Sequence, residues 1–226
     1  MAKKTSEHRE HALRFQVTEA YKKARTNLVY SIIKKGCKKI IFTSPLKGEG
    51  KTTTAINVAI ALSQQKNARV LIIDCDLRCP ATHTYFGLKG TEKGLANFLN
   101  DECSLEEAVS KTKNESLDLI TFGAVPPNPS ELLSSDSMTQ MVEELEKNYD
   151  YIIFDTPPVN VVVDVIPLLR LSDGTVLVVK HNFSTYPEFK IAVDTLKRNQ
   201  AKIAGIIING TPAAGTTGDE YFSRNK

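Results

Sequence analysis

The sequence predicts an α/β fold, a three-layer sandwich in which helices cover both faces of a mostly parallel central sheet. Continuous apolar runs such as 70–73 alternate with helix-like segments, which is typical of parallel strands buried on both faces. A glycine-rich loop separates the first of these strands from the helix that follows it. With 226 residues, 41% of them hydrophobic, the chain is long enough to form one domain with a sizeable core.

Apolar residues at helical spacing identify the expected helices. They recur among charged residues between 15 and 35, and they share one side of the segment 52–65. Short helices are expected at 95–99, 105–111 and 130–133, and longer ones at 138–147 and 186–198.

Short runs rich in β-branched and other apolar residues identify the strands. They are expected at 39–43, 69–74, 117–122, 151–154, 175–179 and 203–208. A single domain is therefore expected over 1–210, including the N-terminal helix 15–35. The segment 211–226, rich in glycine and threonine near its start, is expected to be a flexible tail.

The loop at 43–53, Thr-Ser-Pro-Leu-Lys-Gly-Glu-Gly-Lys-Thr-Thr, carries most of the functional information. The Walker A pattern requires Gly, four free residues, and then Gly-Lys-Ser/Thr. Pro45 replaces the first glycine, whereas the second half of the pattern is kept. Backbone N–H groups and the start of a helix then form a cradle for phosphate groups. The residues expected to bind the nucleotide are Lys47, Gly48, Glu49, Gly50, Lys51, Thr52 and Thr53.

Within this loop, Lys51 is expected to reach the β- and γ-phosphates, and the hydroxyl of Thr52 to ligate Mg²⁺. The strand before the loop and the helix after it are the context that a P-loop requires. The sequence therefore predicts a P-loop NTPase-type domain that binds a nucleoside triphosphate.

Aspartates stand at the ends of two further strands. Asp155 closes the strand 151–154 in the Walker B manner, Asp74 closes the strand 69–74, and Asp76 follows two residues later. In such sheets ligands bind beyond the carboxyl ends of the strands, where one carboxylate can hold Mg²⁺ and another can accept a proton. For Arg78, contact with phosphate and a structural ion pair both remain open.

Charge is distributed unevenly along the chain. Residues 1–40 hold 11 Lys and Arg against 3 Asp and Glu, whereas the rest holds 18 against 23. A basic N-terminal segment suggests an acidic partner or an anionic membrane surface, and a solvated helix face is the alternative. Because aromatic residues are not interleaved with the basic ones, we expect no nucleic-acid partner.

The cellular location of the protein and the redox state of its cysteines are predicted from the absence of certain sequence patterns. No apolar run approaches the ~18 residues needed to span a bilayer, and the N-terminal sequence has no apolar core typical of a secretory signal. The four cysteines lack zinc-like spacing and are expected to be reduced thiols. These observations predict a cytoplasmic protein.

Together these motifs resemble those of the bacterial tyrosine kinases of the capsule and exopolysaccharide type (BY-kinases). The segment 72–78, Ile-Ile-Asp-Cys-Asp-Leu-Arg, fits the A′ motif of that family residue for residue. The segments 126–133 and 155–158 are similar to two further family motifs, and the likeness extends from Glu19 to about Gly210.

The resemblance implies an ATP-dependent protein-tyrosine kinase, an autokinase that regulates capsular or exopolysaccharide synthesis and export. By resemblance, Lys51 and Thr52 bind ATP·Mg²⁺, and Asp76 and Asp155 support the metal. Asp74 is implied as the base toward a tyrosine hydroxyl, so that Asp74, Lys51 and Asp76 form the catalytic group. Asn209 is similar to the adenine-contacting asparagine of related P-loop ATPases.

Two departures from the family pattern concern assembly and the phosphoacceptor. The family's oligomerisation motif is Glu-x-x-Arg-x-x-Arg, whereas this chain has Glu19, Lys22 and Arg25. Because lysine lacks the bidentate geometry of arginine, assembly into a ring is expected to be weaker. A Glu–Lys ion pair within the helix is the simpler interpretation of Glu19 and Lys22. The family's C-terminal tyrosine cluster is reduced to Tyr221, which is expected either to accept phosphate or to be inert.

The resemblance also implies partners. They are a membrane-embedded activator of the chain-length regulator type, a cognate phosphotyrosine phosphatase, and further copies of the chain in an oligomer, for which a ring is one arrangement. Such an activator would recruit the protein to the inner face of the cell membrane.

Two alternatives remain. A partition- or division-type P-loop ATPase would act as a nucleotide-switched scaffold, but its signature lysine lies five residues before the P-loop lysine. Lys47 lies four residues before Lys51, which argues against that class. The other alternative is a non-catalytic regulatory subunit that binds ATP only to assemble.

Overall fold

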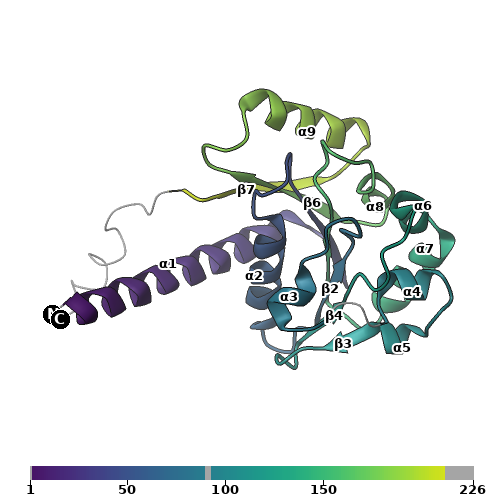
Figure 1. The fold of residues 1–226 in the computed structure, drawn as a ribbon, viewed down its shortest axis with the longest axis horizontal. Coiled ribbons are helices and arrows are strands. Elements are labelled where there is room, and N and C mark those ends of the chain that lie inside the picture. Colours follow the sequence, from purple (N-terminus) through teal and green to yellow (C-terminus); the bar gives the residue numbers. More distant parts are fainter. Residues whose placement is uncertain (1, 90–92, 212–226) are drawn as a thin grey trace.

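A seven-stranded sheet forms the centre of the molecule in the computed structural model, which describes residues 2–89 and 93–211, with side chains from Leu13 onward (Figure 1). Its strand order is β3-β4-β2-β5-β1-β6-β7. The strands are β1 Lys38–Thr43, β2 Val70–Asp74, β3 Val109–Lys111, β4 Leu117–Ile120, β5 Tyr151–Asp155, β6 Gly174–Lys180 and β7 Ile203–Asn209. All neighbouring strands pair in parallel except β3 and β4, so the predicted mostly parallel sheet is confirmed.

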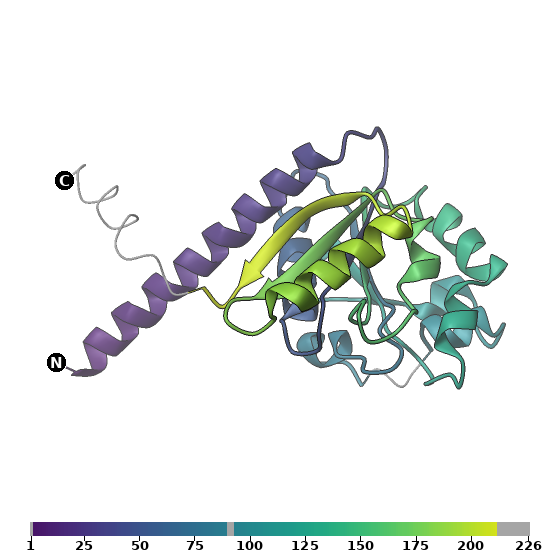
Figure 2. The same cartoon turned by 90° about the horizontal axis from the view of Figure 1, so that it is seen from above.

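Helices connect the strands and cover both faces of the sheet. They are α1 Ala2–Ser31, α2 Lys51–Ser63, α3 Thr82–Phe86, α4 Leu95–Leu99, α5 Leu105–Ala108, α6 Pro129–Leu133, α7 Asp136–Leu145, α8 Ile166–Leu169 and α9 Tyr186–Arg198. One core cluster lies between the sheet and α1 and α2, and the other lies between the sheet and α4 and α6–α9. Figure 2 shows α9 running alongside β6 and β7, at one end of the sheet. The three expected layers are therefore present.

The region 105–111 was expected to be one helix, and that expectation is wrong. Ser104 caps a single helical turn, α5, in a reciprocal capping box with Glu107. The chain then enters β3, where Val109 lies opposite Ile120 in an antiparallel pair. A run this short does not distinguish helix from strand by periodicity alone.

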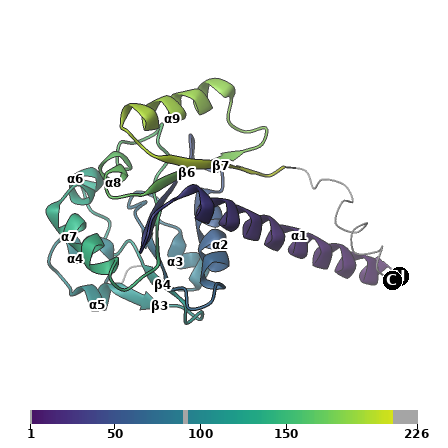
Figure 3. The same ribbon diagram turned by 180° about the vertical axis from the view of Figure 1, so that it is seen from behind.

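The N-terminal helix differs from its expected bounds of 15–35. Helix α1 begins at Ala2 and ends at Ser31, before Gly36, which has a φ of 76°. Its contribution to the core begins at Tyr21 and continues through Leu28. Its N-terminal half extends away from the rest of the domain, as Figures 1 and 3 show.

Over the residues that the structure describes, no helix combines the length and apolar character needed to cross a membrane. Of the predicted flexible tail 211–226, the segment 212–226 lies outside the described residues.

Candidate functional site

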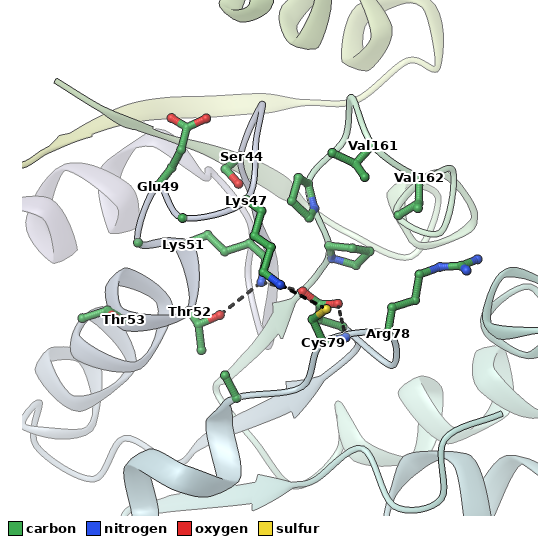
Figure 4. A pocket seen from close by; sticks show the side chains of 16 residues that line it. Ser44, Lys47, Glu49, Lys51, Thr52, Thr53, Arg78, Cys79, Val161 and Val162 are labelled. Carbon is green, nitrogen blue, oxygen red and sulfur yellow. Dashed lines mark hydrogen bonds and ion pairs between the residues drawn. The ribbon is translucent and has the colours of Figure 1, made fainter. Parts of the chain in front are cut away.

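A cavity of about 310 Å³ opens at the carboxyl edge of the sheet (Figure 4). It lies between the loop 44–50 and the segments that follow β2 and β5. The residues that line it are Ser44, Lys47, Gly48, Glu49, Gly50, Lys51, Thr52, Thr53, Asp76, Arg78, Cys79, Ala81, Pro157, Pro158, Val161 and Val162. Every predicted residue of the phosphate-binding loop therefore borders one cavity.

The loop has the backbone geometry that its glycines permit. Gly48 and Gly50 have φ angles of 89° and 84°, in the left-handed region that residues with a Cβ rarely adopt. Helix α2 begins immediately after Gly50, at Lys51. The positive end of a 13-residue helix thus borders the cavity and favours an anion there.

Lys51 lies between the carboxylates of Asp155, the last residue of β5, and Asp76, two residues beyond the end of β2. Its Nζ is 3.0 Å from Oδ2 of Asp76 and 3.2 Å from Oδ1 of Asp155, and only 8% of the residue is exposed. Burial alone would lower the pKa of Lys51, but the two carboxylates outweigh it and raise the pKa above its usual value. The lysine is therefore held as a cation at the start of α2.

Asp155 presents an oxygen suited to a metal ion. It is completely buried, and burial raises the pKa of its carboxyl above the usual value. Its Oδ2 has no hydrogen-bond partner among the described residues. The described residues contain no cluster of three or more His, Cys, Asp or Glu arranged to hold a metal by themselves. Mg²⁺ characteristically needs only one or two carboxylates plus phosphate oxygens, so the site fits this ion in the presence of a nucleotide.

Asp74 lies beside Asp155, because the parallel register of β2 and β5 pairs these two residues. Its Oδ2 accepts hydrogen bonds from the N–H and hydroxyl of Thr82, at 3.1 and 2.6 Å, and from the N–H of Ala81 at 3.3 Å. Burial, together with the charge of Asp155, raises the pKa of Asp74 to about 7. Neither Asp74 nor Asp155 lines the cavity, whereas Asp76 does.

Arg78 forms a bidentate ion pair with Asp164. Its Nε and Nη2 lie 2.6 and 3.1 Å from the two carboxylate oxygens, and Asp164 is completely buried. Of the two possibilities left open by the sequence, the structure shows the ion pair, although Arg78 also borders the cavity. Asp164 was missed because 86 residues separate the partners and no motif links them.

Asn209 and Lys47 were also expected to bind the nucleotide, and in the structure their side chains contact other groups of the protein. The amide Nδ2 of Asn209, at the end of β7, donates to Oγ1 of Thr54 at 2.8 Å and to the carbonyl of Glu49 at 3.1 Å. Asn209 does not line the cavity. Lys47 lines it, with its Nζ 3.6 Å from Sγ of Cys79.

The expected oligomerisation residues make contacts within the chain. Nζ of Lys22 lies 2.8 Å from the carboxylate of Glu19, so the intrahelical pair is present. Nη1 of Arg25 donates to the carbonyl of Ala61 at 3.0 Å, in the last turn of α2. A cation at this end of a helix is stabilising. The predicted phosphoacceptor Tyr221 lies outside the described residues.

The parallel sheet, the phosphate-binding loop at the start of α2 and the acidic ends of β2 and β5 define a P-loop nucleotide-binding protein. In agreement, residues 37–203 match the family model of an AAA domain. The comparisons with individual proteins are more specific.

The chain is 40% identical to the tyrosine-protein kinase YwqD of Bacillus subtilis over 193 residues, which cover 85% of this chain and 81% of that protein. The kinase domain of the Escherichia coli tyrosine kinase ETK is 30% identical with a TM-score of 0.80, covering 89% of this chain and 80% of that one. The chain therefore belongs to the bacterial tyrosine-protein kinases.

A ParA-family ATPase from Chlorobium tepidum is similar in fold alone, at 23% identity and a TM-score of 0.66, covering 82% of this chain and 80% of that one. The kinase interpretation is thus supported over the partition-type ATPase.

Proposed function

We propose that this protein is an ATP- and Mg²⁺-dependent tyrosine kinase that phosphorylates tyrosine on its own copies and regulates capsular or exopolysaccharide synthesis and export. The observation that carries the proposal is the position of Lys51, fixed at the start of α2 by Asp76 and Asp155 from two strand ends. This arrangement gathers a cation, carboxylate oxygens and a helix N-terminus where the phosphates of ATP would enter.

In the proposed mechanism Lys51 and the backbone of the loop bind the β- and γ-phosphates of ATP. Thr52, Asp76 and Asp155 would hold Mg²⁺, which supplies positive charge to the transferring phosphoryl group. The residues of the chain contribute mainly position and electrostatic stabilisation, because phosphoryl transfer needs little covalent chemistry from the protein.

Asp74 is proposed as the base that accepts the proton of the tyrosine hydroxyl. Its carboxylate already accepts a hydrogen bond from one hydroxyl, that of Thr82. A pKa of about 7 suits a base that works near neutral pH. To act directly, Asp74 must exchange the Thr82 hydroxyl for that of the substrate. The competing candidate is Asp76, which already borders the cavity.

Tyr221 is proposed as the phosphoacceptor, and it would be phosphorylated by a neighbouring subunit. The eleven residues from Gly210 to Tyr221 could span at most ~40 Å, which sets the greatest distance at which a neighbouring site could receive Tyr221. Glu19, Lys22 and Arg25 are proposed to contribute to the contact between subunits. In this view 1–210 is the kinase domain, and 211–226 is a C-terminal segment that carries the acceptor.

The remaining proposals concern binding partners and the location of the protein in the cell. A membrane-embedded activator of the chain-length regulator type would dock on the protein and recruit it to the inner face of the cell membrane. A cognate phosphotyrosine phosphatase would reverse the reaction. The basic surplus of residues 1–40 supports attraction to an anionic surface.

The test is phosphotyrosine formation from labelled ATP and Mg²⁺, with and without the cytoplasmic segment of a candidate activator. Wild type is compared with Asp74→Asn, Asp76→Asn and Tyr221→Phe. Loss of phosphotyrosine in Tyr221→Phe identifies the acceptor. Retained transfer in Asp74→Asn would rule out Asp74 as the base and leave Asp76 as the candidate. ATP hydrolysis without phosphotyrosine under every condition would contradict the proposed kinase activity.

A further inference from the structure

Glu49, in the middle of the phosphate-binding loop, is a buried carboxylate that does not point into the cavity. Only 1% of the residue is exposed. In Figure 4 its carboxylate points away from Lys51, toward the strands at the edge of the sheet. Within the described part of the chain, this side chain therefore contacts protein rather than the space where phosphates would bind.

Three hydrogen-bond donors surround the carboxylate of Glu49. The N–H of Leu46 donates to Oε1 at 2.8 Å, the N–H of Lys180 to Oε2 at 2.8 Å, and the hydroxyl of Ser184 to Oε1 at 2.6 Å. One donor belongs to the loop itself, and the other two belong to the segment 180–184, which begins at the last residue of β6 and leads toward α9. A buried carboxylate is stable only when its oxygens are satisfied, and donors alone can satisfy it.

The segment 180–184 also packs directly against the loop. A Cβ added at Gly48 would lie 3.7 Å from the ring of Phe183. From the adjacent strand end, Asn209 donates to the carbonyl of Glu49 at 3.1 Å. The loop is thus tied to the ends of both β6 and β7, through one side chain and through its backbone.

We infer that Glu49 is a positioning residue, which fixes the conformation of the phosphate-binding loop through Lys180 and Ser184. The loop binds phosphates with its backbone, so its N–H groups must be arranged before the nucleotide arrives. Ser184 thereby influences nucleotide affinity although it does not line the cavity. The inference rests on the part of the proposed function that assigns ATP to this loop, and not on phosphoryl transfer.

The experiment compares Glu49→Gln and Ser184→Ala with wild type, using the equilibrium dissociation constant of Mg²⁺·ATP measured by calorimetry and the thermal midpoint of the nucleotide-free protein. Glutamine keeps the shape but replaces one acceptor oxygen with a donor. We expect Glu49→Gln to weaken ATP binding at least about tenfold, which corresponds to one lost charged hydrogen bond. Ser184→Ala should weaken it about three- to tenfold, with the thermal midpoint nearly unchanged.

Two controls separate positioning from a general loss of stability. Glu143→Gln makes the same chemical change at an exposed residue of α7, on another part of the domain, and should leave ATP affinity unchanged. In a second pair, Glu49→Ala removes the whole carboxylate, so the double variant Glu49→Ala/Ser184→Ala should bind ATP no more weakly than Glu49→Ala, because Ser184 acts on the loop only through that carboxylate. Additive losses in the double variant, or wild-type affinity in Ser184→Ala, would overturn the inference.

The outcome is independent of phosphoryl transfer. If wild type binds ATP normally but forms no phosphotyrosine, the proposed kinase activity is contradicted. The role of Glu49 is then decided only by the ATP affinities of the variants. If wild type does not bind ATP, both the proposed kinase activity and the positioning role of Glu49 are contradicted.

Discussion

Replacing Asp74 with asparagine should stabilise the ligand-free protein at pH 8 while abolishing phosphoryl transfer. Burial beside Asp155 raises the pKa of Asp74 from 3.8 to about 7, so the folded state holds the charged form at a cost. At about 1.4 kcal/mol per pH unit, that cost reaches about 4 kcal/mol above pH 7. Asparagine carries no charge and avoids it.

The cost depends on pH in a defined direction. Well below pH 3.8 the carboxyl is protonated in both the folded and the unfolded state, and no cost exists. It grows as the pH rises from 3.8, the unfolded value, to about 7, the folded value, and then stays constant. At pH 5 it is only about 1 to 2 kcal/mol.

Asparagine also loses part of the hydrogen bonding of Asp74. Its amide nitrogen would face the N–H of Asp76, which now donates to Oδ1 at 3.2 Å, and this conflict costs about 1 to 3 kcal/mol. The net expectation is a gain of about 1 to 3 kcal/mol in the free energy of unfolding at pH 8, and almost none at pH 5.

The assay is urea denaturation of wild type and Asp74→Asn at pH 5 and pH 8, with chelator present to exclude metal ions. Asp118→Asn is the control, because Asp118 is also buried but pairs with Lys111 at 2.8 Å and Tyr149 at 2.7 Å, so its variant should be destabilised. An effect of Asp74→Asn that is the same at both pH values would refute the reasoning. So would a loss of stability at pH 8.

Three further predictions concern the loop and the N-terminal helix. Lys51→Met should weaken ATP binding more than about 100-fold in calorimetry, since it removes the cation between two buried carboxylates; tight binding in this variant would disprove the assignment of the loop. Gly50→Ala should weaken ATP binding about tenfold or more, because its Cβ would lie 2.5 Å from Nδ2 of Asn209 at a φ of 84°. Gly36→Ala, with a φ of 76° and open space, is its control and should cost about 1 kcal/mol of stability without affecting the nucleotide. Lys22→Arg, which restores the bidentate group of the assembly motif, should increase the oligomeric fraction in light scattering; an unchanged monomer fraction would separate residue 22 from assembly.

The main features of the site could be predicted from the sequence because they depend on which residues end the parallel strands, at the carboxyl edge of the sheet. Strands that run in parallel bring their carboxyl ends to one side, so Asp74 and Asp155 had to lie near the loop that follows β1. The position of Lys51 beside both Asp76 and Asp155 follows from the same geometry.

Other features depend on contacts that sequence spacing does not reveal. Glu49 was expected to bind nucleotide as part of the loop, but its side chain pairs with residues 131 and 135 positions away. The edge strand β3 exists because Val109 finds a partner on β4, not because three residues have a strong local preference. Helices α3 and α8 have five and four residues, too few to show helical periodicity.

The length of α1 gives the molecule two regions of different local stability. The helix has 30 residues, about 45 Å at 1.5 Å per residue, and its contribution to the core begins only at Tyr21. Since helical stability comes mainly from packing, the projecting half can open and close while the core stays folded. Amide hydrogens before Tyr21 should therefore exchange with solvent much faster than those that follow it. A partner that packs along the projecting half of α1 must hold it in its helical form. The conformational entropy lost in doing so makes the contact weaker and easier to reverse.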